Sequence, residues 1–138
     1  MAIQEVIFRG KRKDNGEWVE GYYSNLGGNR PCILKEHILN GKMARILEYE
    51  NIIVLPSTVG QYTSLDDKNG VRIFEGDIVR YGDTIHEVVF EKRNTTAYFG
   101  LVYSEIETMP FGHYQDLNHI EVIGNINDSP ELLEGDTK

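Results

Sequence analysis

The residues with metal-ligand chemistry that lie closest together in the sequence are His113, Asp116 and His119. Imidazole nitrogens and carboxylate oxygens bind zinc and other transition metals, so a loop-and-strand site with one further ligand would suit a metal-assisted hydrolase. The paired-ligand spacing typical of zinc sites is absent, however, and polar residues such as Asn118 alternate with these groups. We therefore interpret the segment as a polar loop and predict no metal.

Other catalytic patterns are equally incomplete. Glu75 and Asp77 are two residues apart, as a carboxylate pair for acid–base chemistry would require, but the glycine between them predicts a turn. Cys32 lies between proline and isoleucine, which favours a core position over a nucleophile. Gly41-Lys42 lacks the remaining residues of a phosphate-binding loop. We predict that the chain is not an enzyme and binds no cofactor.

Two groups of basic residues, each with aromatic residues nearby in the sequence, suggest a different chemistry. They are Arg9, Lys11, Arg12 and Lys13, followed by Trp18 and Tyr22, and Arg80, Lys92 and Arg93, with Tyr81, Tyr98 and Phe99. Proteins that bind single-stranded nucleic acids combine cations with aromatic rings in this way. The alternative is that the aromatic residues form the core and the cations lie on a solvated rim. Nucleic-acid binding through these seven basic residues is therefore our second hypothesis.

Charge is unevenly distributed along the 138 residues, whose net charge is −8. Residues 105–138 contain one basic and eight acidic residues, a net charge of −7, whereas residues 1–104 contain 13 basic and 14 acidic residues, a net charge of −1. The acidic balance therefore counts against nucleic-acid binding mainly at the carboxy-terminal end. The single cysteine, the lack of a signal-peptide pattern and the lack of a long apolar run indicate a cytoplasmic protein that does not enter a membrane.

The elements that would position these residues are strands. Ile and Val together number 24 against 13 for Ala and Leu, which favours β structure. Turn pairs such as Asn15-Gly16, Asn69-Gly70 and Gly82-Asp83 separate short apolar segments and predict hairpins. We expect a loop at 105–112 and a last strand at 120–126, with Ile120, Val122 and Gly124 on one face.

The predicted fold is mainly β and has three parts. Residues 1–57 form an amino-terminal region of antiparallel hairpins, and residues 58–127 form a small SH3-like barrel, since their short strands recur about every 8 to 12 residues. Residues 128–138 form a short helical turn, with Ser129 as its N-cap and Pro130 at the first helical position, and an acidic tail.

Several segments resemble the YopX family of phage and prophage proteins. They are residues 59–70 (VGQYTSLDDKNG), 73–79 (IFEGDIV), 121–126 (EVIGNI) and 130–133 (PELL), together with the opening Phe8-Arg9. Ser64 occupies a position where the family often has glycine. The resemblance implies a β protein of phages or prophages that forms homo-oligomers, and it implies no activity and no catalytic or binding residues.

Together these observations favour a non-catalytic phage or prophage accessory protein, a β interaction module that associates with itself and with a phage or host protein. Its expected location is the cytoplasm of the bacterial host.

Overall fold

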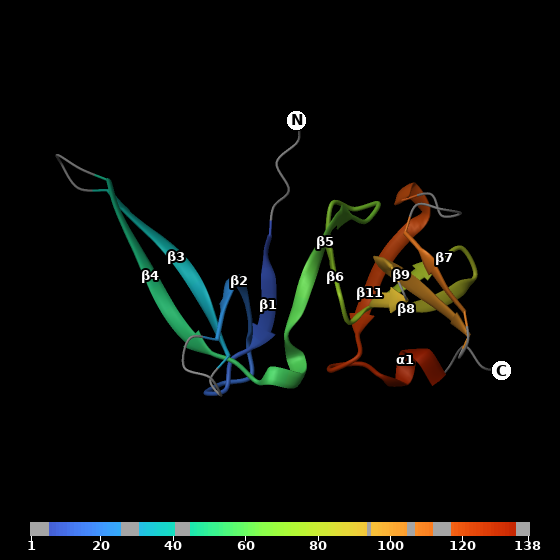
Figure 1. The fold of residues 1–138 in the computed structure, drawn as a ribbon, viewed down its shortest axis with the longest axis horizontal. Helices are drawn as coiled ribbons and strands as arrows, with labels where there is room; N and C mark the ends of the chain where they lie inside the picture. The colour runs from blue at the N-terminus through green and yellow to red at the C-terminus, as the bar shows by residue number, and fades with distance from the viewer. Residues whose placement is uncertain are drawn as a thin grey trace. The chain divides into compact units, whose positions relative to one another are not determined.

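The computed structural model describes residues 6–25, 31–40, 45–93, 95–104, 107–111 and 117–134, with the backbone alone at 38–40, 45–48 and 93. The chain divides into two compact units, Met1–Gln61 and Tyr62–Lys138. Strands dominate both units (Figure 1), so the predicted β class is confirmed.

The first unit is an antiparallel sheet in the order β4-β3-β2-β1-β5, in which Phe8 and Arg9 of β1 pair with Gln61 and Gly60 of β5. Its elements are β1 (Phe8–Lys11), β2 (Trp18–Ser24), β3 (Cys32–Asn40), β4 (Arg45–Ile53), the 3-10 helix η1 (Pro56–Thr58) and the beginning of β5 (Gly60–Asp66). After β4 the chain returns to β1, where Val54 forms an antiparallel bridge with Arg12. The core consists of Val19, Ile33, Ile52 and Val54, against which Phe8 and Val59 pack.

Glycine at position 21 allows β3 to lie against β2 where no side chain would fit. A Cβ atom at Gly21 would lie 2.2 Å from the carbonyl oxygen of Leu34. The pairing of β2 with β3 covers only Tyr22 to Ser24, whereas Gly21 pairs with Phe8 of β1. From residue 35 onward β3 therefore continues without β2 beside it.

The second unit contains an antiparallel sheet in the order β10-β9-β8-β7-β11. Its elements are the remainder of β5, which pairs with β6 (Arg72–Phe74), then β7 (Asp77–Tyr81), β8 (Thr84–Arg93), β9 (Thr96–Ser104), β10 (Glu107–Pro110), the 3-10 helix η2 (Leu117–His119), β11 (Ile120–Asn125) and α1 (Glu131–Glu134). Five fully buried residues form the core, namely Ile73, Val79, Val88, Leu101 and Ile120.

The described strands form two open antiparallel sheets and no closed barrel, so the predicted SH3-like barrel is not confirmed. Regular spacing predicts how many strands there are, but closure depends on whether the first and last strands pair. The segment 107–110 was also expected to be a loop, and it is the edge strand β10. Its pairing with β9 depends on Gly100, where a Cβ atom would lie 2.5 Å from the carbonyl oxygen of Met109.

A β-bulge in β11 changes the predicted alternation of its side chains. Val122 lies opposite Val79 of β7, but Gly124 lies opposite Ile78, so Ile123 is the additional residue. Because a bulge shifts the register by one residue, Gly124 does not share a face with Ile120 and Val122. The prediction that these three residues share a face is therefore wrong beyond Val122.

The helices of the described chain are short. Residues 131–134 form α1, in agreement with the predicted helical turn after Ser129. None of the helices in the described ranges has the length and apolar character needed to cross a membrane.

Tight turns lie where the glycine pairs predict them. Gly16, Gly70 and Gly82 have φ values of 74°, 78° and 59°. This left-handed conformation carries no steric cost for glycine. The sequence also predicts turns at Asn40-Gly41 and Arg93-Asn94, but Gly41 and Asn94 lie outside the described residues.

Ser64 has the same left-handed conformation without being glycine. Its φ is 72°, and within the described part of the chain it is the one non-glycine residue with positive φ. It lies where the pairing of β5 with β6 is irregular. Since this conformation costs an L-amino acid about 1–2 kcal/mol, the glycine expected here from the YopX resemblance has a conformational reason.

The buried carboxylate of Asp67 joins the turn after β5 to the last strand. Its Oδ1 accepts hydrogen bonds from the amides of Asn69 (2.8 Å) and Val71 (2.9 Å), and its Oδ2 accepts one from the amide of Val122 (2.9 Å). Burial acts to raise the pKa of Asp67, but these three hydrogen bonds and the charge of Lys68 outweigh it, so the pKa lies below its ordinary value. The Asp-Lys-Asn-Gly turn is thus fixed by its own first residue.

Candidate interaction surfaces

Arg9 and Lys11 lie on the same face of the first unit's sheet as Trp18. Lys11 is directly opposite Trp18 in the register, and Arg9 is two residues before Lys11. The guanidinium carbon of Arg9 is 4.7 Å, and the Nζ atom of Lys11 5.5 Å, from the centre of a Trp18 ring. Both distances are within the range of cation–π interactions. Two of the predicted cations thus lie beside an aromatic ring.

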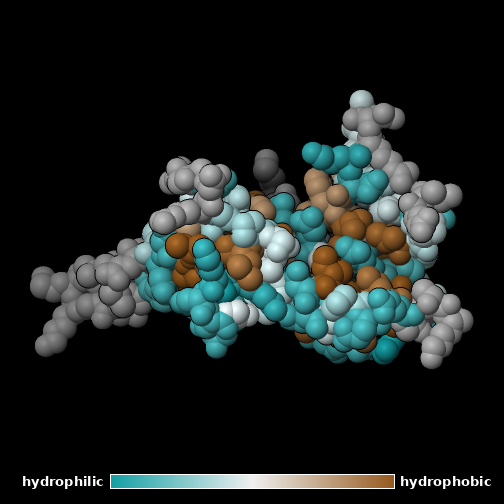
Figure 2. Space-filling view, turned by 90° about the horizontal axis from the view of Figure 1, so that it is seen from below, coloured by the Kyte–Doolittle hydropathy of each residue, from teal (hydrophilic) through white to brown (hydrophobic). Residues whose placement is uncertain are grey.

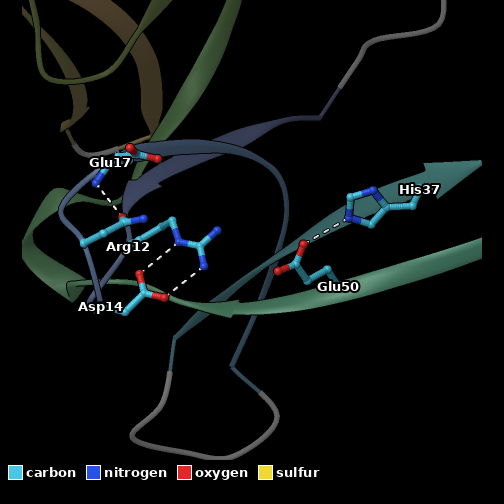
Figure 3. A network of polar contacts seen from close by, with 6 residues as sticks. Arg12, Asp14, Glu17, His37 and Glu50 are labelled. Atoms are coloured by element: carbon cyan, nitrogen blue, oxygen red, sulfur yellow. Dashed lines mark hydrogen bonds and ion pairs between the residues drawn. The ribbon is translucent and has the colours of Figure 1, made fainter.

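Arg12 belongs to a different environment, shown in Figure 3. Its guanidinium forms two hydrogen bonds of 2.9 Å with the carboxylate of Asp14, which lowers the pKa of that exposed carboxyl. Arg12 and Lys13 line a hollow of about 320 Å³ with Asp14, Glu50 and residues 51–53. Its two cations face two carboxylates, so this hollow has no net preference for an anion.

The second predicted group of cations does not come together. Arg80 pairs with Ile85 of β8, whereas Lys92 and Arg93 pair with Ala97 and Thr96 of β9. Seven residues along β8 separate Ile85 from Lys92, a distance of about 20 Å along an extended strand. Arg80 therefore lies near one end of β8, and Lys92 and Arg93 lie at the other.

Charge differs strongly between the two units. Residues 1–61 contain eight basic and seven acidic residues, a net charge of +1, and residues 62–138 contain six basic and 15 acidic residues, a net charge of −9. A polyanion would therefore be repelled by the second unit and not by the first.

The hairpin of β3 and β4 extends beyond the rest of the first unit's sheet (Figure 1). We call residues 35–40 of β3 and 45–50 of β4 the arm. Within the described chain, the two strands of the arm pair only with each other. The pairing of β3 with β2 ends at Leu34, and β4 is an edge strand of the sheet. In the register Ile38 lies opposite Leu47 and Leu39 opposite Ile46. The arm thus combines two open backbone edges with four aliphatic residues.

Two tyrosines, Tyr22 and Tyr49, lie where the arm joins the sheet. Their rings are 6.4 Å apart, and 48% of Tyr22 and 52% of Tyr49 is exposed. They share the face of the sheet that carries Trp18, since Tyr22 is four residues along β2 from Trp18. Figure 2 shows one face of the molecule, on which apolar residues lie among hydrophilic ones.

The second unit has a polar hollow of about 280 Å³ at one end of β7 and β11. It is lined by Lys68, Arg80, Tyr81, Gly82, Asn118, His119 and Glu121. Nζ of Lys68 is 2.9 Å from Oε2 of Glu121, and Glu121 lies directly opposite Arg80 in the register. These residues belong to three separate segments that only strand pairing brings together. The hollow could therefore not be predicted from the sequence.

Two of the candidate catalytic residues, Asp77 and Cys32, are buried in the fold. His113 and Asp116 lie outside the described residues. Among the residues that the structure describes, no three His, Cys, Asp or Glu side chains are grouped as metal ligands. Asp77 is 1% exposed and accepts a 2.7 Å hydrogen bond from the amide of Phe74, so it stabilises the turn containing Gly76. Burial, and then the negative charge of Glu75, raise the pKa of Glu87. Cys32 is buried.

Comparison with known proteins shows a family match and similarity to solved structures. The family described as YopX protein matches residues 7–134, nearly the whole chain. No curated protein matches the sequence. The crystal structure of protein EF1440 from Enterococcus faecalis is similar, with 24% identity, a TM-score of 0.62, and coverage of 95% of this chain and 99% of that chain. At this identity the similarity shows a shared fold.

Proposed function

Because this chain belongs to the YopX family, which provides a fold but no activity, we propose its function from its own surfaces. It is a non-catalytic accessory protein of a phage or prophage that acts in the cytoplasm of the bacterial host. It works as a β interaction module that associates with copies of itself through the arm and contacts a phage or host protein in that form.

The observation that carries this proposal is the arm itself. An isolated two-stranded hairpin is only marginally stable in water. Open strand edges are sites where another chain can add a strand, and natural proteins usually block them with charges, prolines or covering elements. No proline interrupts the arm, its charged residues are of both signs, and its segments 35–40 and 45–50 pair with no third strand among the described residues. A partner that covers the arm would bury its aliphatic residues and satisfy its backbone.

The sequence of β4 is complementary to a second copy of itself. In an antiparallel pairing of two β4 strands around a two-fold axis, one register places Arg45 opposite Glu48 and Ile46 opposite Leu47 of the other copy. Every ion pair and apolar pair then occurs twice. Opposite charges and apolar pairs directly across strands stabilise such a sheet.

The exposed tyrosines are suited to the same interface. Tyr22 and Tyr49 lie at the base of the arm, and Tyr49 is within β4 itself. Tyrosine, tryptophan and arginine contribute much of the binding energy in protein interfaces because they bury large areas at low entropic cost. A second copy paired along β4 would lie beside Tyr49, against which the ring of Tyr22 packs.

Replacing Leu47 by lysine tests the proposal. The wild-type chain is expected to have a mass in solution that is a multiple of 15.8 kDa. Leu47→Lys introduces a charge into the aliphatic part of β4 and is expected to reduce the mass to that of one chain. Light scattering coupled to size-exclusion chromatography measures the mass, and circular dichroism checks that the sheet is retained.

Val71→Lys is the matched control, because Val71 is 48% exposed and belongs to the second unit, not to the arm. It is expected to leave the mass unchanged. A monomeric wild-type protein at about 100 µM, or a Leu47→Lys protein that stays oligomeric, would contradict the proposal.

A second candidate function, nucleic-acid binding, is supported by the position of Arg9 and Lys11 against Trp18. Trp18 is the single tryptophan, so its fluorescence reports on this site alone. If the site binds, a single-stranded oligonucleotide should quench Trp18 at low salt, and Lys11→Gln should weaken the binding several-fold while Lys92→Gln should not. Unchanged fluorescence at high oligonucleotide concentration would remove this candidate.

A further inference from the structure

We propose that the hollow lined by Lys68, Arg80 and His119 in the second unit binds a phosphate group. The ligand class is a small molecule with one phosphate, since about 280 Å³ is at the lower limit of the volumes of small-molecule sites. The proposal concerns a surface separate from the arm and does not depend on the oligomer.

The cations of the hollow are concentrated in an acidic unit. Residues 62–138 contain six basic residues against 15 acidic ones, and two of the six, Lys68 and Arg80, line this one hollow. Glu121 is the one carboxylate among the described lining residues, so their permanent charges sum to +1. The hollow thus attracts an anion although the unit as a whole repels polyanions, which favours a small ligand over a nucleic acid.

The position of Lys68 is fixed before any ligand binds. Its amide donates a hydrogen bond of 2.9 Å to the carbonyl oxygen of Ile120, and the preceding residue, Asp67, is held by three amides. Its Nζ atom is in turn oriented by Glu121. Because an ammonium group has three donors, the ion pair with Glu121 leaves further donor capacity for a ligand.

Arg80 contributes the complementary geometry. It lies on β7 directly opposite Glu121 of β11, so the carboxylate of Glu121 has Lys68 as its ion-pair partner and Arg80 as its cross-strand neighbour. A planar guanidinium binds two oxygens of a phosphate at once, and a lysine adds a point charge. His119, Asn118 and Tyr81 place nitrogen- and oxygen-bearing side chains around the same space. This combination matches the several oxygens of a phosphate better than a single carboxylate.

The test is a titration of the full-length ¹⁵N-labelled protein with sodium phosphate, compared with sodium chloride at equal ionic strength. Phosphate is expected to shift the amide resonances of Lys68, Arg80, Tyr81, Gly82 and His119 in a saturable manner. Arg80→Gln should weaken this binding about tenfold or more, as expected for the loss of a charged hydrogen bond. Because Arg80 is exposed, the variant should fold.

Lys92→Gln is the control for charge alone, since Lys92 is an exposed cation of the same unit at the far end of β8. It should bind phosphate as the wild type does. Shifts that do not saturate, that spread over the whole unit, or that Arg80→Gln leaves unchanged would overturn the proposal. An oligothymidylate without terminal phosphates is the second probe. If it shifts these amides and inorganic phosphate does not, the small-ligand site is also overturned.

Discussion

Replacing Asp67 by alanine is expected to lower the free energy of unfolding of the second unit by about 3–4 kcal/mol, because three backbone amides lose a charged acceptor. Asn69 and Val71 belong to the turn after β5, whereas Val122 belongs to β11, so the substitution releases the turn and its attachment to the last strand together. Urea unfolding followed by amide resonances of the second unit measures the change. Asp83→Ala, at an exposed turn position, should change the stability by less than about 0.5 kcal/mol.

The same carboxylate gives the stability a defined dependence on pH. Since the pKa of Asp67 in the folded chain lies below its value in the unfolded chain, about 3.9, ionisation favours folding. The contribution is complete above the unfolded pKa and is lost as the pH falls through the lower, folded pKa. The difference in stability between the wild type and Asp67→Asn should therefore be constant from pH 7 to about pH 5 and should decrease below pH 4. A constant difference down to pH 2 would contradict this assignment.

Gly21→Ala is expected to destabilise the first unit by about 3 kcal/mol, because the new Cβ atom would lie 2.2 Å from a backbone oxygen. That oxygen belongs to Leu34, which pairs with Tyr22, so β3 would have to move away from β2. Unfolding followed by Trp18 fluorescence reports on this unit. If the arm forms the oligomer, the same substitution should also reduce the mass measured in solution.

Gly16→Ala separates this steric effect from the cost of backbone strain. Gly16 has a φ of 74°, and no atom lies within 4 Å of its potential Cβ, so alanine there should cost only about 1–2 kcal/mol. Equal losses for the two variants would show that the contact at Gly21 is relieved without disturbing β3.

Local features of the fold could be predicted from the sequence, and long-range ones could not. The turns at Gly16, Gly70 and Gly82 depend on residues within each turn, and they lie where predicted. The strand β10 depends on the close approach of Met109 to Gly100, and the bulge at Ile123 depends on the register with β7. Neither contact leaves a pattern within the segment itself. For the same reason, regular strand spacing did not reveal that the second sheet stays open.

The candidate sites follow the same rule. Arg9 and Lys11 lie near Trp18 because all three belong to one hairpin. Arg80 and Lys92 are close in sequence, yet the direction of β8 separates them. The hollow around Lys68 joins residues up to 53 positions apart, from Lys68 to Glu121. In the sequence, the signals for it were the turn at 66–70 and His119, which was considered as a metal ligand. The extension of the arm beyond β2 left no pattern in the sequence, because it depends on the register between β2 and β3.

The order in which the ribosome releases the chain gives the Asp67 hydrogen bonds a further consequence. Val122, whose amide donates a hydrogen bond to Asp67, lies 55 residues further along the chain. The carboxylate of Asp67 therefore lacks this hydrogen bond until β11 has left the exit tunnel. The sheet pairing of the first unit, by contrast, lies within the first 61 residues. Since domains generally fold as units during synthesis, the amino-terminal one first, the arm can form while the second unit is still being translated. For the proposed self-association, this means that the arm is available to a second copy before the second unit is complete.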